Sequence, residues 1–338
     1  MALRLIEIVL SEQYSEKIER LLEDHPSSDF WHDRISKGKI LVRALVPSEE
    51  TEEMVDLLNR NFSGTDGFRI ILIPIEASVP RADPSVETGE QEKLLPEENQ
   101  KKKIKRISRD ELYEDIADTA ELSRVYIVMV VLSAIVATIG ILQNNVAVII
   151  GAMVIAPLLG PNVAMSFATT IGDPNLFRSA LKVNAAGIII AFLLAAFLGA
   201  FLSVDPDIPE IALRTRIGPG DIVLALAAGS AGALAFTTGI ATTLVGVMVA
   251  VALLPPLVTF GLLIGSGQKA VALGAMLLFI TNVICVNLSG VVTFLAQRIM
   301  PSSFYEAERA RRATRIAIIF WLILLSMLAV VIVISQRN

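Results

Sequence analysis

The 338-residue chain is poor in the side chains that most often perform catalysis or bind metals. It has one cysteine, Cys285, which lies in an apolar run, and two histidines, His25 and His32. A single cysteine excludes an intramolecular disulfide and a thiolate cluster around a metal. The motifs G-x-S-x-G, Walker A and H-E-x-x-H are also missing from the sequence. We therefore expect no enzyme, no metal and no cofactor.

Charged residues are scarce in the second part of the chain. Residues 1 to about 124 resemble a charged soluble protein, whereas residues 125–335 are almost uncharged. The net charge of -5 gives no reason to expect nucleic-acid binding. Between residues 125 and 300, every acidic residue falls at the end of a predicted span or in a loop. This placement disfavours a pump that relays protons through an intramembrane carboxylate.

The first 78 residues predict a small α+β domain. Strand-like runs at 4–10, 39–46 and 68–75, a weaker one near Phe30-Trp31, and two helical stretches give the order β-α-β-β-α-β. That order is typical of a ferredoxin-like fold. We interpret Trp31 as a buried aromatic residue and His32 as a surface imidazole. Such a domain could bind a small molecule, form a dimer or pack against the rest of the chain.

Residues 79–124 predict a charged linker followed by a helix. Residues 79–100 are rich in proline and acidic residues and lack an apolar period, which predicts flexibility. The basic block at 101–109 either fixes the membrane topology or attracts anionic lipid. After Ser108, apolar residues recur at every fourth position, at Leu112, Ile116 and Ala120. We expect this amphipathic helix to lie on the membrane surface.

Residues 125–335 predict a transmembrane domain in a lipid bilayer. A helix needs about 20 apolar residues to cross the hydrocarbon core. Basic residues near the span ends on the side of the first domain outnumber those on the other side by fourteen to four. That bias predicts a multi-pass membrane protein with the N-terminal domain in the cytoplasm. The seven expected spans are 125–142, 146–171, 180–203, 221–236, 238–264, 270–296 and 316–335.

An internal similarity relates two parts of this membrane region. The stretch GAMVIAPLLGPN begins at Gly151, and an echo, GVMVAVALLPP, begins at Gly246, 95 positions later. At the same offset Pro161 matches Pro256. Each half, 125–203 and 221–296, holds three predicted spans, so the second half enters the membrane in the opposite sense. The sequence thus predicts an inverted three-plus-three repeat, with the span at 316–335 added.

The two proline-containing stretches predict a binding site near the middle of the membrane. Prolines that break a helix release backbone amides and carbonyls, which can bind an anion, a cation or a polar group. Alternatively, the prolines only kink the helices, and the asparagines only bond neighbouring helices. The candidate substrate-binding residues are Pro157, Gly160, Pro161, Asn162, Asn184, Thr242, Thr243, Pro255, Pro256, Asn282 and Asn287.

The run GAMVIAPLLGPNVAMSFATTIGD at 151–173, preceded by GILQNN at 140–145, resembles a prokaryotic membrane family catalogued as domain of unknown function 389. The similarity covers roughly residues 125–300. The resemblance implies a multispanning inner-membrane protein and supplies no catalytic residues.

Together these features predict a transporter or channel for a small solute or ion, with a regulatory or dimerisation head. The alternative is a sensor or scaffold that transports nothing and whose helices bind lipid or partner helices. Small residues such as those at 228–232, and the N-terminal domain itself, favour a homodimer.

Overall fold

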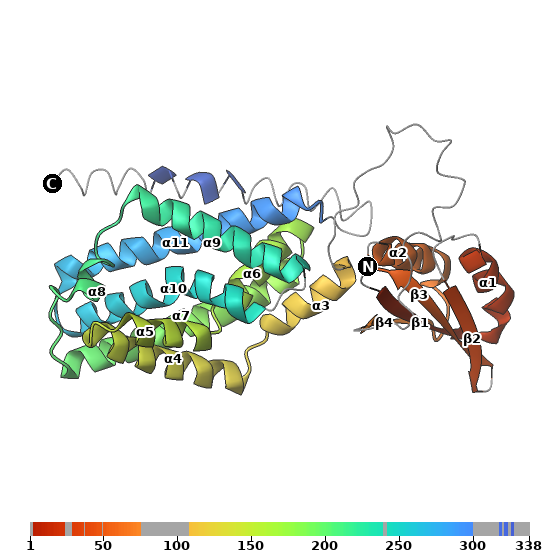
Figure 1. Cartoon of the computed structure of the whole chain (residues 1–338), viewed down its shortest axis with the longest axis horizontal. Coiled ribbons are helices and arrows are strands. Elements are labelled where there is room, and N and C mark those ends of the chain that lie inside the picture. The colour runs from red at the N-terminus through yellow and green to blue at the C-terminus, as the bar shows by residue number, and fades with distance from the viewer. Residues whose placement is uncertain are drawn as a thin grey trace. The chain divides into compact units, whose positions relative to one another are not determined.

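The computed structural model describes residues 3–23, 29–36, 38–48, 50–75, 108–238 and 242–299, and a few positions between 318 and 327. Within 242–251 it describes the backbone without the side chains. The chain divides into two compact units, Met1–Leu112 and Tyr113–Asn338. The division falls within the helix α3, Arg109–Thr119 (Figure 1).

The first unit is an antiparallel sheet with two helices packed on one face. The chain runs β1 (Leu3–Ser11), the 3-10 turn η1 (Glu12–Tyr14), α1 (Ser15–Glu23), β2 (Asp29–Ser36), β3 (Lys39–Pro47), α2 (Thr51–Phe62) and β4 (Arg69–Ile75). The four strands lie in the order β2-β3-β1-β4. The element order is the predicted one, and β2 is a full strand paired with β3 rather than a weak one.

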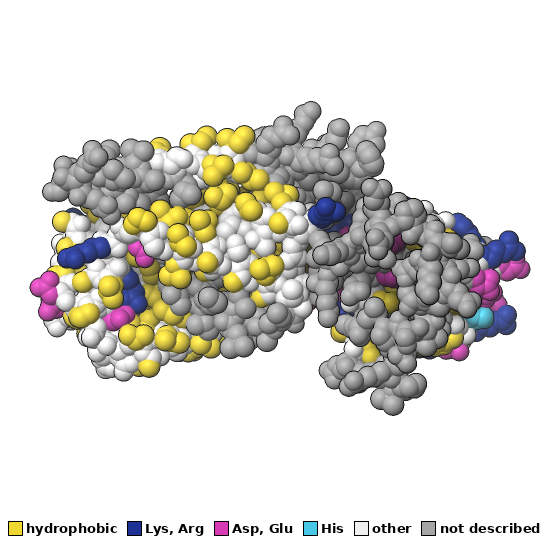
Figure 2. Space-filling model, turned by 45° about the horizontal axis from the view of Figure 1, so that its top comes forward, with side chains coloured by type: hydrophobic (Ala, Val, Ile, Leu, Met, Phe, Trp, Pro, Cys, Tyr) yellow, Lys and Arg dark blue, Asp and Glu magenta, His cyan; other side chains and the backbone are white. Residues whose placement is uncertain are grey.

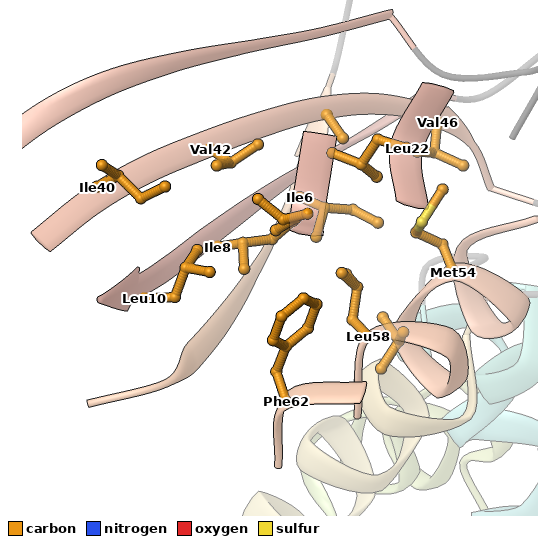
Figure 3. Close-up of a cluster of buried hydrophobic side chains, with 13 residues drawn as sticks. Ile6, Ile8, Leu10, Leu22, Ile40, Val42, Val46, Met54, Leu58 and Phe62 are labelled. Carbon is orange, nitrogen blue, oxygen red and sulfur yellow. The ribbon is translucent and has the colours of Figure 1, made fainter. Parts of the chain in front are cut away.

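The core of this unit lies between the sheet and its helices (Figure 3). Alternate residues of β1, such as Ile6 and Ile8, point toward the helices and are fully buried. Met54 and Leu58 of α2 and Ile18 of α1 contact them from the other side. Because side chains alternate across a strand, the odd-numbered residues of β1 and β3 line the opposite face.

Trp31 contradicts our expectation of a buried aromatic residue, because it is 45% exposed. It is paired with Arg43 of β3 and so lies on the sheet face opposite the helices. The exposure of Trp31 therefore follows from the register between β2 and β3. His32 is exposed, as predicted, and its Nδ1 lies 3.4 Å from a carboxylate oxygen of Glu19.

The second unit is a bundle of apolar helices (Figure 1). Among the described residues, α4 (Arg124–Leu142), α7 (Pro174–Phe201), α9 (Pro219–Thr238) and α11 (Lys269–Ala296) are long and apolar enough to cross a membrane. A bent pair, α5 (Val146–Ile155) and α6 (Leu159–Ile171), would form a fifth span. The remaining helices are the apolar α10 (Thr242–Gly265) and the short α8 (Pro209–Ala212). The span expected at 316–335 lies almost entirely outside the described residues.

The outer surface of these helices is apolar. Along α7, Ile189, Leu193, Phe197 and Phe201 recur at every fourth position, and each is more than half exposed. Figure 2 shows hydrophobic side chains over much of the described part of this unit. Contiguous exposed apolar surface of this kind is rare in soluble monomers. The helices therefore suggest a multi-pass membrane protein.

Local sequence sets several of the helix ends. The Ser123 hydroxyl accepts a hydrogen bond from the amide of Tyr126 and caps α4, and Asn145 caps α5 through the amide of Val148. Asp173 caps α7, where Pro174 occupies the first turn. The proline costs nothing there, because that amide would have no helical partner.

Two sets of helices have matching bounds. α7 and α11 both have 28 residues, and their first and last residues are 95 positions apart. Gly172 follows α6 and Gly267 follows α10, and both adopt a positive φ, of 74° and 83°. These glycines are also 95 positions apart, the same offset as Gly151 and Gly246.

The packing of the helices follows the same division. In the first set, α7 packs against α4 and α6, and α4 packs against α5. In the second set, α9, α10 and α11 pack against one another. Between the sets, α6 packs against α11, and α10 packs against α7 and also against α5 and α4. The middle helix of each set therefore contacts the last helix of the other.

The helix α3 differs from our expectation of a helix lying on the membrane surface. Its apolar residues Ile116 and Ala120 are buried. The ring of Tyr113 contacts Phe167 of α6, and the side chain of Thr119 lies against Gly160 at the start of α6. This face of α3 therefore packs on protein rather than on lipid.

Candidate functional site at a helix break

The break between α5 and α6 lies where the sequence predicts it. α5 ends at Ile155 and α6 begins at Leu159, with a bend of 52° between them. Pro157 has no amide hydrogen to donate to the preceding turn, and a residue before proline favours extended backbone. Ala156 has the extended conformation, with ψ at 118°. Pro161 falls in the first turn of α6, where its missing donor costs little.

Gly160 also lies at this break, but its role is close packing. A Cβ atom at this position would lie 2.6 Å from the Cβ of Thr119 and 3.0 Å from its hydroxyl oxygen. The absence of a side chain lets the end of α3 approach α6. The structure thus explains Gly160 without a ligand.

One turn into α6, three of the predicted asparagines meet in what we call the amide cluster: Asn162 and Ser166 of α6, Asn184 of α7 and Asn287 of α11. All four are at most 4% exposed. The Nδ2 atoms of Asn184 and Asn287 donate to Oδ1 of Asn162 over 3.1 Å and 3.0 Å. The Ser166 hydroxyl donates to the carbonyl oxygens of Asn162 and Asn287 over 3.1 Å and 3.2 Å.

The hydrogen bonds of the amide cluster form a nearly closed set. Nδ2 of Asn162 donates to the carbonyl of Leu158 over 2.8 Å and to Oδ1 of Asn184 over 3.4 Å. Nδ2 of Asn287 also donates to the carbonyl of Val283 over 2.9 Å. A buried polar group left unpaired costs roughly 1–3 kcal/mol, so these amides stabilise one another. A solute could bind to these amides only by replacing the hydrogen bonds that they make with one another.

The predicted break at Pro255-Pro256 is wrong, because α10 continues as a helix through both prolines. Pro256 cannot donate to the carbonyl of Ala252, one turn earlier. The side chain of Asn282 on α11 supplies the missing donor, with Nδ2 2.6 Å from that oxygen. In packed helices such substitutes let a proline remain inside a helix.

Asn282 therefore does not join the amide cluster. It is directed at α10, and among the described residues its Oδ1 has no hydrogen-bond partner. Asn287 is five residues further along α11, which turns it toward α6 instead. The side chains of Thr242 and Thr243 lie outside the described residues, so their predicted role stays a prediction.

Ser166 is the residue of this site that sequence reasoning did not select. It is four residues after Asn162, so the two share one face of α6. Its neighbour across the interface is Gly290 of α11, where a Cβ atom would lie 2.7 Å from the Ser166 hydroxyl oxygen. This combination of a hydroxyl and a glycine on facing helices could have indicated the contact.

The α7–α10 interface is the counterpart of the α6–α11 interface at the offset of 95 residues. At this offset Gly261 is the counterpart of Ser166, and Ala195 is the counterpart of Gly290. Gly261 and Ala195 are also in contact, since a Cβ atom on Gly261 would lie 2.6 Å from the Cβ of Ala195. Asn287 corresponds to Phe192, whose ring stacks on Phe260 with centroids 4.8 Å apart. The described part of this second interface is apolar where the first one is polar.

Charged groups stay outside the described helical interior. The charged residues that are buried in the described parts of the chain are Arg109 on α3 and Glu210 on α8. Glu210 pairs with Arg214, 2.5 Å away, in the segment between α7 and α9. Among the described residues, no group of histidine, cysteine and acidic side chains could hold a metal ion. The chemistry available at the amide cluster is that of neutral amides, hydroxyls and carbonyls.

Comparison with known proteins identifies the family. A family model described as "Domain of unknown function (DUF389)" matches residues 153–288, a range that contains all four asparagines considered above. The uncharacterized protein MJ0678 of Methanocaldococcus jannaschii is 36% identical over 304 residues, which cover 90% of this chain and 91% of that protein. The chain belongs to this family of uncharacterised proteins. No solved structure matches it.

Proposed function

We propose that the protein is a transporter or channel of the inner membrane for a small polar solute or ion, with its permeation path at the α6–α11 interface. The observation that carries this proposal is the amide cluster. It gathers polar side chains from three apolar helices beside a helix break and contains no buried charge among its members. Intramembrane polar residues are costly and tend to mark solute pathways.

The chemistry of the cluster limits the solute. Amide oxygens and backbone carbonyls can replace the water around a monovalent cation, and amide nitrogens can do so around a neutral polar molecule or an anion. Asn162 is the central group, because both other asparagines donate to its Oδ1. Asn162, Asn184, Ser166 and Asn287 would contact the solute after their mutual hydrogen bonds open.

An inverted repeat is part of the proposal. The matching bounds of α7 and α11, and the paired contacts Ser166–Gly290 and Gly261–Ala195, support two halves related by the offset of 95 residues. In such proteins, solute sites lie where the two halves meet. The amide cluster has this property, since α6 and α7 belong to one half and α11 to the other.

The N-terminal unit is proposed to be a cytoplasmic regulatory or dimerisation module with a ferredoxin-like fold. Its strand order β2-β3-β1-β4 and its element order support that fold. The cytoplasmic placement rests on the excess of basic residues on that side of the predicted spans.

The near-closed hydrogen bonding favours a second candidate, a sensor or scaffold that transports nothing. In that case the amides would bond the helices permanently, as polar residues do in many membrane bundles. The two candidates differ in one property. A permeation path admits water and small polar reagents to the amide cluster, and a scaffold excludes them.

Thiol labelling tests this property at two matched positions. In a Cys285→Ala background, which removes the native thiol, we would compare Asn287→Cys with Phe192→Cys, its counterpart in the apolar interface. The measurement is the rate of reaction with a small charged thiol reagent in membrane vesicles. A path at the α6–α11 interface predicts labelling of Asn287→Cys at least about tenfold faster, since charged reagents avoid apolar protein interiors.

A third variant guards against an artefact of the substitution. Ser166→Cys changes the side chain little and should also react faster than Phe192→Cys. Equal protection of all three cysteines would contradict a path at this interface and favour the scaffold. Labelling of Phe192→Cys as fast as the others would contradict the placement of the path.

A further inference from the structure

The sheet of the first unit has one face that neither α1 nor α2 covers. It carries the odd-numbered residues of β1, β3, β4 and of β2 up to Asp33, and the helices α1 and α2 pack on the other face. Trp31, Ile71 and Ile73 on this open face are 45%, 39% and 38% exposed. In a small domain, large apolar side chains gathered on one exposed face mark an interaction surface.

The strand register places these residues in rows across the sheet. One row is Trp31, Arg43, Glu7 and Ile71, and a neighbouring row contains Leu45, Leu5 and Ile73. Apolar side chains thus surround a small group of charges. We call this surface the open sheet face.

The central charges are paired with each other. Nε of Arg43 donates to Glu7 over 2.8 Å, and an Nη atom of Arg43 donates to Asp33 over 2.9 Å. The hydrogen bond that Arg43 donates to Glu7, and the negative charges of Glu7 and Asp33, raise the pKa of Arg43, so it stays charged. The open sheet face therefore has both signs of charge in its centre and apolar side chains around them.

This distribution of charge selects among the possible occupants. An anionic membrane surface or a nucleic acid requires a large excess of basic groups, whereas the described part of the open sheet face carries Lys39, Arg43 and Arg69 against Glu7 and Asp33. The lipid interior would require removing these charges from water. A surface with mixed signs can complement a second copy of itself, with the arginine of one copy near the carboxylates of the other.

We propose that the open sheet face pairs with the open sheet face of a second copy of this chain. Four strands about 4.8 Å apart, each with about seven residues, give a footprint of roughly 450 Å² per copy. Two such faces bury less than the roughly 1,200–2,000 Å² of a standard stable interface. Confinement of both copies to one membrane would raise their effective concentration, so that so small an interface could hold them together. The test therefore uses the full chain in membranes and not the isolated first unit.

Cross-linking in membranes tests the proposal. In a Cys285→Ala background, Ile71→Cys and Trp31→Cys each place one thiol on the open sheet face, and Glu16→Cys places one on α1, where the side chain is 89% exposed. A short bifunctional thiol reagent should give a dimer band from a face cysteine at least about fivefold stronger than that from Glu16→Cys, because pairing raises the effective concentration. Each variant alone reports an axis across the strands, and mixing the two variants reports an axis along the strands, which would place β2 of one copy over β4 of the other.

A charge reversal provides the second arm. Arg43→Glu would place three carboxylates at the centre of each face and should abolish the dimer band of the face cysteines. Arg20→Glu on α1, where the side chain is 80% exposed, is the matched reversal and should leave the band unchanged. Circular dichroism and Arg43→Lys, which keeps the charge, separate this effect from misfolding.

Three results would overturn the proposal. The first is a dimer band no stronger from the face cysteines than from Glu16→Cys. The second is a band that persists in folded Arg43→Glu. The third is a cross-linked product whose mass is not twice that of the chain, which would identify a different partner. None of these results depends on whether the helical unit transports a solute.

Discussion

The α6–α11 and α7–α10 interfaces occupy corresponding places in the chain but use different chemistry. At the offset of 95 residues, Asn287 is matched by Phe192 and Ser166 by Gly261. One interface is held by hydrogen bonds between amides, and the other by stacked rings and close backbone contact. Similar packing can therefore be maintained with or without polar groups. Only the polar version offers groups that a solute could bind.

The two interfaces should also differ in how rigid they are. Helices in lipid gain no hydrophobic energy from association, so the apolar interface depends on van der Waals contact between closely packed backbones. Such contact tolerates little change in distance. Hydrogen bonds between amides can be exchanged for bonds to a ligand. We therefore expect α7–α10 to act as the fixed part of the bundle and α6–α11 as the part that opens.

The largest predicted effect comes from a glycine-to-alanine change in the apolar interface, with the matching change in the polar interface as its comparison. A Cβ atom on Gly265 of α10 would collide with the backbone carbonyl oxygen of Ala196, which cannot move without moving α7. Gly265→Ala should lower the free energy of unfolding by about 3 kcal/mol. A Cβ atom on Gly290 meets only the side chain of Ser166, so Gly290→Ala should cost about 1 kcal/mol.

Thermal unfolding in detergent measures both variants against the unmodified chain. Equal losses would show that the polar interface is as rigid as the apolar one. A larger loss of stability from Gly290→Ala than from Gly265→Ala would show that the polar interface is the more rigid one.

A smaller effect is expected when the polar interface is made apolar. Asn162→Leu leaves the Nδ2 groups of Asn184 and Asn287 without their acceptor and should cost about 2–3 kcal/mol of stability. Adding Asn287→Leu removes one of those orphaned donors. The double variant should therefore lose less than the sum of the two single losses. Additive losses in a double-mutant cycle would show that the two amides do not interact.

The smallest predicted effect concerns Tyr113, which bonds α3 to the end of α6. Its hydroxyl donates to Asp173 over 2.9 Å, whereas Gln268, the counterpart of Asp173 at the offset of 95 residues, donates to the carbonyl oxygen of Val204. Burial, and then the hydrogen bond to Asp173, raise the pKa of Tyr113 above its usual value of about 10. The folded state therefore favours the protonated phenol. Tyr113→Phe should cost about 1 kcal/mol at neutral pH.

The sign of the pH dependence follows from this shift. The phenol proton of Tyr113 adds to the free energy of unfolding at any pH below the pKa of tyrosine in the unfolded chain. This stabilisation is lost as the pH rises through the raised pKa of Tyr113 in the folded state. The difference in melting temperature between the unmodified chain and Tyr113→Phe should shrink above about pH 10. A difference that stays constant to high pH would show that packing on Phe167, and not the hydrogen bond, carries the effect.

Local sequence features account for most helix bounds in the second unit and for the order of strands and helices along the first. Apolar runs separated by capping residues such as Ser123 and Asp173 set where α4 and α7 begin. Pro157 determined the break after α5, because a missing amide and the extended residue before it act locally. These features depend on neighbours within a few residues, which a single sequence displays.

Which polar residues meet depends instead on how the helices pack. Asn162, Asn184 and Asn287 join because three helices bring them together, whereas Asn282, equally plausible in sequence, bonds the Ala252 carbonyl instead. That bond supplies the donor that Pro256 lacks, and α10 stays helical where the sequence predicted a break. The exposure of Trp31 likewise depends on the register between β2 and β3. Contacts between different helices or strands, here 12 to 125 residues apart in the chain, depend on packing geometry, which local sequence does not specify.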